Sequence, residues 1–288
     1  GDLVWTRRTL EENGARNKDW GMAGSPLIID QKVIVSPGGP NGKSLVAYHK
    51  DNGDFVWGGG DARAGYSSPS LTKLAGMEQI LIFNMGQVSS HAPGTGEVIW
   101  QHPWSNGFSV QHVAQPVPLP SDRVFVSTGY GVGCELLQVN ADEDLALNVS
   151  VVWKSPRLQA KFTNVVHRDG YIYGLDNGRL VCLDLQDGQR KWKRGRYGHG
   201  QMILVDDILL IQAESGEVVL VDADPRGFNE RAKFQAIVGK TWNNPALAGR
   251  YLLVRNSREA ACYEVKIKGK ERPISGVRSP EQAGNGGE

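Results

Sequence analysis

The residues of this chain best suited to bind a ligand are aromatic and polar side chains that stand between short apolar stretches. Ten of them are candidates for a ligand-binding face: Trp20, Tyr66, Lys161, Asn164, Arg196, Tyr197, His199, Lys240, Trp242 and Asn243. Flat rings stack on planar groups and attract cations, and ammonium and guanidinium groups form charge-assisted hydrogen bonds with anions. These residues predict a site for an anionic, planar or sugar-like ligand, or for a protein partner.

Patterns typical of catalysis or metal binding are not found among the same segments. The three cysteines, Cys134, Cys182 and Cys262, are far apart and have no metal-ligand spacing, and the six histidines never pair at such a spacing. The acidic residues near the candidates are Asp19 and Asp61, too few for a calcium site together with a general base. We therefore expect no metal, and no catalytic residue can be assigned.

The overall charge excludes some classes of partner. The chain has 288 residues, of which 32 are basic and 31 acidic, so no global field attracts nucleic acid. No apolar run approaches the length that crosses a bilayer, and no transmembrane helix is predicted.

The elements that must position the candidates are marked by a recurring tryptophan. Trp5, Trp57, Trp100, Trp153 and Trp192 each end a similar phrase, in which a turn precedes a short apolar strand. The interval is roughly 40 to 50 residues, which is typical of propellers and solenoids.

Six units can be aligned on this rhythm, each with short strands separated by hairpin turns. The fourth unit is the clearest, with the turns Asp169-Gly170, Asn177-Gly178 and Asp187-Gly188 between its apolar runs. Such dipeptides suit the positive φ angles of tight hairpins. The fifth unit ends in Phe234 instead of tryptophan. The sequence predicts an all-β fold, a β-propeller of four-stranded blades with six blades visible.

The two ends of the repeat region leave the blade total open. The sixth unit has three strands, and residues 1–5 read as a single additional strand. Either the chain closes as a six-bladed ring, with residues 1–5 beside 260–265, or it holds the last six of about eight blades and is truncated at its N-terminus. We expect a propeller domain over residues 1–267 and a disordered polar tail over 268–288.

Two segments resemble a known repeat. Residues 47–57 (Ala-Tyr-His-Lys-Asp-Asn-Gly-Asp-Phe-Val-Trp) and 181–192 (Val-Cys-Leu-Asp-Leu-Gln-Asp-Gly-Gln-Arg-Lys-Trp) resemble the pyrroloquinoline-quinone (PQQ) repeat. That repeat occurs in bacterial quinoprotein alcohol dehydrogenases and in the propeller lipoprotein of the outer-membrane β-barrel assembly machinery. The resemblance covers residues 1 to about 266. It implies closing tryptophans docked between blades, ligands bound where one blade crosses to the next, and a periplasmic or otherwise extracytoplasmic location.

Three functions are compatible with this resemblance. The first is a non-catalytic binding or scaffold domain, a monomer that needs no cofactor and binds a protein partner or an anionic or sugar-like ligand. The second is a PQQ-dependent alcohol dehydrogenase with calcium, although that family uses an adjacent cysteine pair and this sequence has none. The third is a carbohydrate-binding propeller that uses Trp20, Tyr66 and Trp242. The sequence favours the first.

Overall fold

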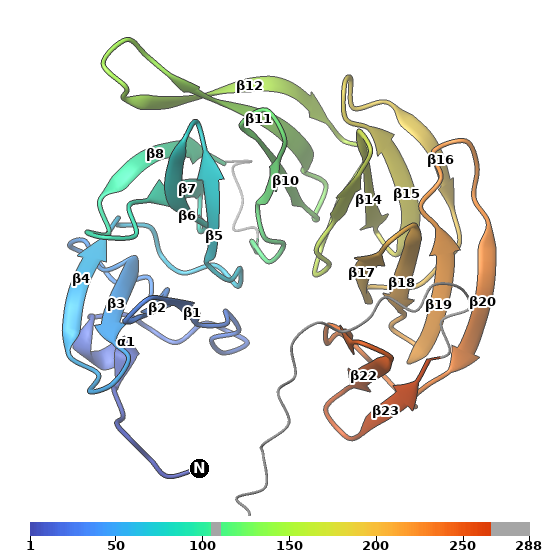
Figure 1. Ribbon diagram of the computed structural model, residues 1–288, viewed down its shortest axis with the longest axis horizontal. Helices are drawn as coiled ribbons and strands as arrows, with labels where there is room; N and C mark the ends of the chain where they lie inside the picture. The colour runs from blue at the N-terminus through green and yellow to red at the C-terminus, as the bar shows by residue number, and fades with distance from the viewer. Residues whose placement is uncertain (105–110, 266–288) are drawn as a thin grey trace, which may run out of the picture.

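The computed structural model describes residues 1–104 and 111–265, and it is built almost entirely of antiparallel sheets around a central axis (Figure 1). The single helix of this part is α1 (Thr9–Glu12), which precedes the first sheet. In the described ranges no helix is long and apolar enough to cross a membrane. The all-β prediction is confirmed.

Each sheet is a blade whose strands follow in chain order, four in blades 1 to 5 and three in blade 6 as described. Blade 1 contains β1 (Leu27–Ile29), β2 (Lys32–Val35), β3 (Leu45–His49) and β4 (Phe55–Gly59). Blade 2 contains β5 (Ser70–Leu74), β6 (Met77–Asn84), β7 (Gln87–His91) and β8 (Val98–Pro103). Blade 3 contains β9 (Val117–Leu119), β10 (Arg123–Thr128), β11 (Gly133–Ala141) and β12 (Leu147–Ser155).

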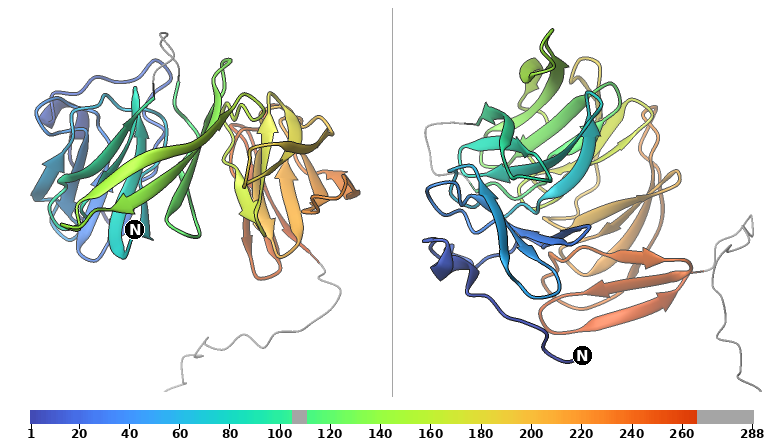
Figure 2. Two further views of the ribbon diagram at one scale, coloured as in Figure 1. Left: turned by 90° about the horizontal axis from the view of Figure 1, so that it is seen from above. Right: turned by 60° about the vertical axis from the view of Figure 1, so that its left-hand side comes forward.

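The second half of the chain repeats the pattern. Blade 4 contains β13 (Val166–Arg168), β14 (Tyr171–Asp176), β15 (Arg179–Asp184) and β16 (Arg190–Arg194). Blade 5 contains β17 (Gln201–Val205), β18 (Ile208–Gln212), β19 (Glu217–Asp222) and β20 (Glu230–Gln235). Blade 6 contains β21 (Ala246–Ala248), β22 (Tyr251–Arg255) and β23 (Ala260–Glu264). Figure 2 shows the blades following one another from the blue blade 1 to the red blade 6.

The hairpin turns predicted from the sequence have the expected backbone angles. Asp169 and Gly170 have φ angles of 47° and 84°, and Asn177 and Gly178 have 46° and 85°. Both pairs lie in the left-handed region, as tight hairpins between twisted strands require. They connect β13 to β14 and β14 to β15.

The apolar core lies between neighbouring blades. One cluster packs Phe125 and Leu136 of blade 3 against Ile172 and Val181 of blade 4, and the other clusters join the remaining neighbours in the same way. A blade therefore buries its faces only against the blades beside it, as repeat proteins do.

The closing tryptophans reinforce these interfaces. The indole Nε1–H of Trp57 donates to the carbonyl of Pro93, in the turn before the outer strand of the next blade, at 3.2 Å. Trp153 and Trp192 do the same with Leu185 (3.0 Å) and Asp224 (2.8 Å). Trp100 differs, because its Nε1–H donates to Gln79 of its own blade at 2.8 Å. These tryptophans dock between blades, as the PQQ-repeat resemblance implies.

The N-terminal segment also has a tryptophan that donates to a backbone carbonyl, but it forms no strand. Trp5 donates to the carbonyl of Lys50 in blade 1 at 2.6 Å, while Leu3 and Val4 are largely exposed. Residues 1–8 contain no strand and do not pair with β23, so the proposed closure of residues 1–5 beside 260–265 is not formed. The N-terminus lies on the side of the molecule between blades 1 and 6 (Figure 1). The predicted tail, residues 268–288, lies outside the described residues.

Candidate ligand-binding site

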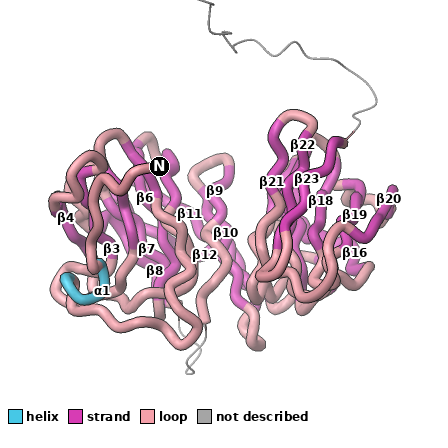
Figure 3. The backbone as a smooth tube through the Cα atoms, turned by 90° about the horizontal axis from the view of Figure 1, so that it is seen from below, coloured by secondary structure: helices cyan, strands magenta, loops and turns pink. Residues whose placement is uncertain are grey.

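The connections between blades gather at one end of the sheets. Because blades 1 to 5 each have an even number of antiparallel strands, the chain leaves the outer strand at the end where the next inner strand begins. The hairpin between the second and third strands of a blade turns at this same end. Figure 3 shows the strands running between two ends where the loops collect. We call the end with the crossings the crossing face.

A belt of polar side chains ties the crossings together. Equivalent positions, four residues before the end of each blade's first strand, hold Ser25, Gln115, Asn164, Gln201 and Asn244 in blades 1, 3, 4, 5 and 6. We call these residues together with Ser68, two residues before β5, the belt.

The hydrogen bonds of the belt run from blade to blade. The backbone N–H of Ser25 donates to Ser68 Oγ at 2.9 Å, and Gln115 Nε2 donates to the carbonyl of Ser68 at 3.2 Å. Asn164 Nδ2 donates to Gln115 Oε1 at 3.1 Å. The Nε2 of Gln201 donates both to the carbonyl of Phe162 at 2.6 Å and to that of Trp242 at 3.2 Å. These hydrogen bonds thus link the segments that precede all six blades to one another.

A cavity of about 580 Å³ opens above the belt, and we call it the central cavity. Five aromatic rings line it: Trp20, Tyr66, Tyr130, Phe162 and Trp242. Four of them form two pairs, Trp20 with Tyr66 at a centroid distance of 6.1 Å and Phe162 with Trp242 at 4.8 Å. Trp20 is 73% exposed and Trp242 41%, so the indoles present ring surface to solvent.

Positive charge dominates the electrostatics of this cavity. Lys161 is the one charged residue among its described lining, and its Nζ lies 4.8 Å from the centre of the Tyr130 ring. Two further lysines lie over lining rings, Lys18 over Tyr66 at 4.8 Å and Lys240 over Trp242 at 4.1 Å. No carboxylate lines the cavity within the described ranges.

A carboxylate outside the lining holds one of the rings in place. Glu214 accepts hydrogen bonds from Trp242 Nε1–H and from the backbone N–H of His199, both at 2.9 Å. Burial alone would raise the pKa of Glu214, but these hydrogen bonds and the positive charges of His199 and Lys240 lower it below its ordinary value. The carboxylate therefore stays ionised at neutral pH and fixes the edge of the indole.

Half of the ten candidates predicted from the sequence line the central cavity: Trp20, Tyr66, Lys161, Asn164 and Trp242. The other five do not. Tyr197 is buried and donates to Glu230 at 2.7 Å, which is a structural role, and Arg196 is exposed away from the lining. His199 packs edge-on against Phe162 from outside the lining, and Lys240 covers Trp242. Asn243 is a neighbour of two lining residues but is not one itself.

Sequence reasoning missed several residues of the lining. Tyr130 lies on the hairpin between β10 and β11, which reaches the crossing face although it is not a crossing. Phe162 was overlooked beside Lys161. The amides of Gln115, Gln201 and Asn244 could have been found by aligning the repeats, because they stand at the same position as Asn164.

The lining does not fit PQQ with calcium. Calcium requires six to eight oxygen ligands, usually including carboxylates, and the described lining offers no carboxylate. Across the described ranges no group of three or more His, Cys, Asp and Glu side chains is placed to hold a metal ion. The described cysteines are all free, two of them buried. The described residues of the central cavity therefore do not supply the carboxylate ligands that calcium beside PQQ would use.

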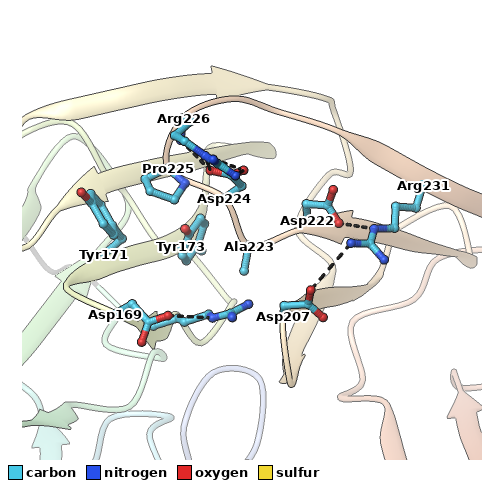
Figure 4. Close-up of a pocket in the computed structure, with 11 residues that line it drawn as sticks. Asp169, Tyr171, Tyr173, Asp207, Asp222, Ala223, Asp224, Pro225, Arg226 and Arg231 are labelled. Atoms are coloured by element: carbon cyan, nitrogen blue, oxygen red, sulfur yellow. Dashed lines mark hydrogen bonds and ion pairs between the residues drawn. The ribbon is translucent and has the colours of Figure 1, made fainter. Parts of the chain in front are cut away.

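A second cavity, of about 440 Å³, lies at the opposite ends of the strands, between blades 4 and 5 (Figure 4). Its charges are paired within it. Arg226 binds Asp224 through two nitrogens, at 2.6 and 2.9 Å, and Arg231 contacts both Asp222 and Asp207. The Arg226 guanidinium lowers the pKa of Asp224 to about 2. With its charged groups already paired, this cavity is less suited to a ligand than the central one.

The fold and the cavity define the chain as a β-propeller of four-stranded blades with a polar-aromatic cavity at its crossing face. The chain belongs to the family described as outer membrane protein assembly factor BamB, which matches residues 1–194. No curated protein matches it.

Solved structures share the fold. BamB from Moraxella catarrhalis aligns with a TM-score of 0.65 and 14% identity, covering 88% of this chain and 72% of its own. Sqt1 from Saccharomyces cerevisiae aligns with 0.62 and 11% identity, covering 82% and 69%. The quinohemoprotein alcohol dehydrogenase from Comamonas testosteroni aligns with 0.54 and 13% identity, covering 75% and 43%. At these identities the similarity concerns the fold alone.

Proposed function

We propose that this protein is a non-catalytic binding domain whose ligand or partner enters the central cavity at the crossing face. The observation that carries the proposal is the lining itself: five rings, a row of amides and one lysine, with no carboxylate among the described lining residues. Stacking surfaces and hydrogen-bonding groups bind ligands, whereas a carboxylate base or a metal site needs carboxylates that these residues do not supply.

The rigidity of the site supports the same proposal. The belt fixes the crossings before anything binds, so the loss of conformational entropy on association is small. A scaffold that presents a preformed surface gains affinity from this property.

The family adds a context for the proposal. Its description names an assembly factor of outer membrane proteins. With this support we propose that the protein acts in the periplasm or in another extracytoplasmic compartment, where it would hold a partner or ligand without a cofactor.

Site-specific cross-linking tests where binding occurs. Benzoylphenylalanine replaces Tyr130, which lines the central cavity, or Tyr171, which lines the cavity at the opposite ends of the strands. After export of each variant to the periplasm of a Gram-negative bacterium and irradiation, we expect defined adducts from position 130 and none from position 171. Equal labelling from both positions, or none from 130, would contradict the proposal.

An activity assay tests the absence of catalysis. The purified protein is incubated with PQQ, calcium, primary alcohols and a redox dye. We expect no reduction of the dye above the rate without protein. Sustained turnover would replace the binding proposal with an oxidoreductase.

A further inference from the structure

The two ring pairs of the central cavity offer flat apolar faces on separate walls. Trp20 and Tyr66 come from the segments before blades 1 and 2, and Phe162 and Trp242 from those before blades 4 and 6. The indole of Trp242 is held at its edge by Glu214 and has Lys240 over its ring, and 41% of the residue stays exposed for stacking. Aromatic faces fixed in this way bind ligands that present flat, weakly polar C–H surfaces.

The electrostatics of the cavity select a negative ligand. Lys161 is half-buried in the lining and has no carboxylate within 4 Å among the described residues. Lys18 and Lys240 lie over the outer rings and add positive potential at the rim. An anion entering the cavity meets no competing carboxylate among the described lining residues, and the half-buried setting of Lys161 strengthens the attraction.

The remaining polar groups suit a ligand rich in hydroxyls. The belt amides use part of their hydrogen-bonding capacity on one another, and Gln111 supplements them in the lining. The Oε1 of Gln111 is buried and has no donor among the described residues. A primary amide both donates and accepts, and so does a sugar hydroxyl.

We propose that the central cavity binds an acidic glycan, a chain of hexuronate type whose sugar faces stack on Trp242 and Trp20 while a carboxylate meets Lys161. This inference rests on the proposed function and names the ligand class of the same site. The volume of about 580 Å³ lies within the usual range for sites that enclose a small organic ligand, so a short segment of the glycan would enter. A peptide is less suited, because the lining has few aliphatic side chains to receive one of its own.

Calorimetric titration with tetragalacturonate tests the inference, with cellotetraose as the uncharged probe of equal length. We expect saturable binding of tetragalacturonate, at least tenfold tighter than that of cellotetraose. Trp242→Ala should weaken it at least tenfold, and Trp242→Phe, which keeps a ring, should weaken it less. Lys161→Met should bring the two probes to similar affinity. Lys191→Met, on the outer strand β16 and away from the cavity, is the matched control and should change nothing.

Three results would overturn the inference: no saturable binding of tetragalacturonate, equal binding of cellotetraose to the wild type, or equal binding of hexaglutamate. The last would show a general anion site open to acidic peptides. Failure of the glycan alone leaves the proposed function standing if position 130 still cross-links. Failure of both removes the proposed function as well.

Discussion

Gly188 shows how a single residue without a side chain can decide how two blades meet. It has a φ of 68°, and a Cβ built on it would lie 2.8 Å from the indole of Trp153. Gly53 and Gly96 are in the same situation with Trp5 and Trp57. Glycine is therefore required at these positions for two reasons: the backbone φ is positive, and the indole leaves no room for a Cβ.

Gly188→Ala should destabilise the protein more than Gly170→Ala. Both positions have positive φ, so both variants lose about 1 kcal/mol through backbone strain, but a Cβ at Gly170 meets open space. At Gly188 the indole must also shift, which adds about 1–3 kcal/mol. Chemical denaturation of the two variants measures the difference, and equal losses would show that the indole moves freely.

His112 makes stability depend on pH. It is buried, stacks on Phe83 at a centroid distance of 4.3 Å, and its Nδ1 has no partner in the described ranges. Burial, followed by the charge of Lys18, lowers its pKa from 6.5 to about 4. The unfolded chain therefore binds a proton at this residue between pH 6.5 and 4 and the folded one does not, so stability falls as pH falls through that window.

The full effect of His112 is about 3 kcal/mol, because each pKa unit corresponds to about 1.4 kcal/mol. In His112→Gln the free energy of unfolding should decline less steeply from pH 7 to pH 4.5 than in the wild type. Denaturation at several pH values measures both slopes. Identical slopes would mean that other groups carry the pH dependence.

At the scale of elements, the crossings were harder to predict than the strands. Strand positions follow from alternating apolar residues and Asn-Gly or Asp-Gly turns, which act locally. The position of Arg196 or Tyr197 in a crossing depends instead on how the loop folds back, and Tyr197 turns inward to Glu230. Tyr130 reaches the cavity from a hairpin, which only the three-dimensional arrangement reveals.

One amide of the belt, that of Gln201, connects three crossings. Gln201 is 5% exposed, and Gln201→Leu would remove its hydrogen bonds to the carbonyls of Phe162 and Trp242. Leaving these part-buried acceptors unpaired should cost about 1–3 kcal/mol. Hydrogen exchange should also speed up at the amides of residues 161–164 and 241–244. Gln186→Leu, on an exposed turn, is the control, and unchanged exchange in the first variant would contradict a tying role for the belt.

At the scale of the whole molecule, stability is divided among interfaces between consecutive blades. The repeat rhythm in the sequence predicted this architecture and its six units. It left open how the ends meet, and residues 1–5 form no strand beside the last blade. Residues of the central cavity come from the segments at all six blades.

Trp153→Ala should loosen one interface and leave distant blades intact. The indole packs with Phe125 at 6.1 Å between ring centroids and donates to Leu185 of blade 4. Its loss should cost about 3–5 kcal/mol. Exchange protection should fall in β12 to β16 and stay near wild type in β2 and β3. Trp20→Ala, at an exposed indole, should leave the melting temperature within a degree or two. Uniform loss of protection would show that the molecule opens as one unit.

The docking of closing indoles such as Trp57 and Trp153 onto the following turn has a consequence for how such chains change length over generations. A duplication of one blade with its tryptophan and its turn glycine copies both the indole that docks and the turn that receives an indole. The same contact already occurs at two places. Trp57 docks on the turn with Pro93 and Gly96, and Trp153 docks on the turn with Leu185 and Gly188. A newly inherited copy would fit the blade before it and the blade after it without any further mutation, so whole repeats can be gained or lost where single strands cannot.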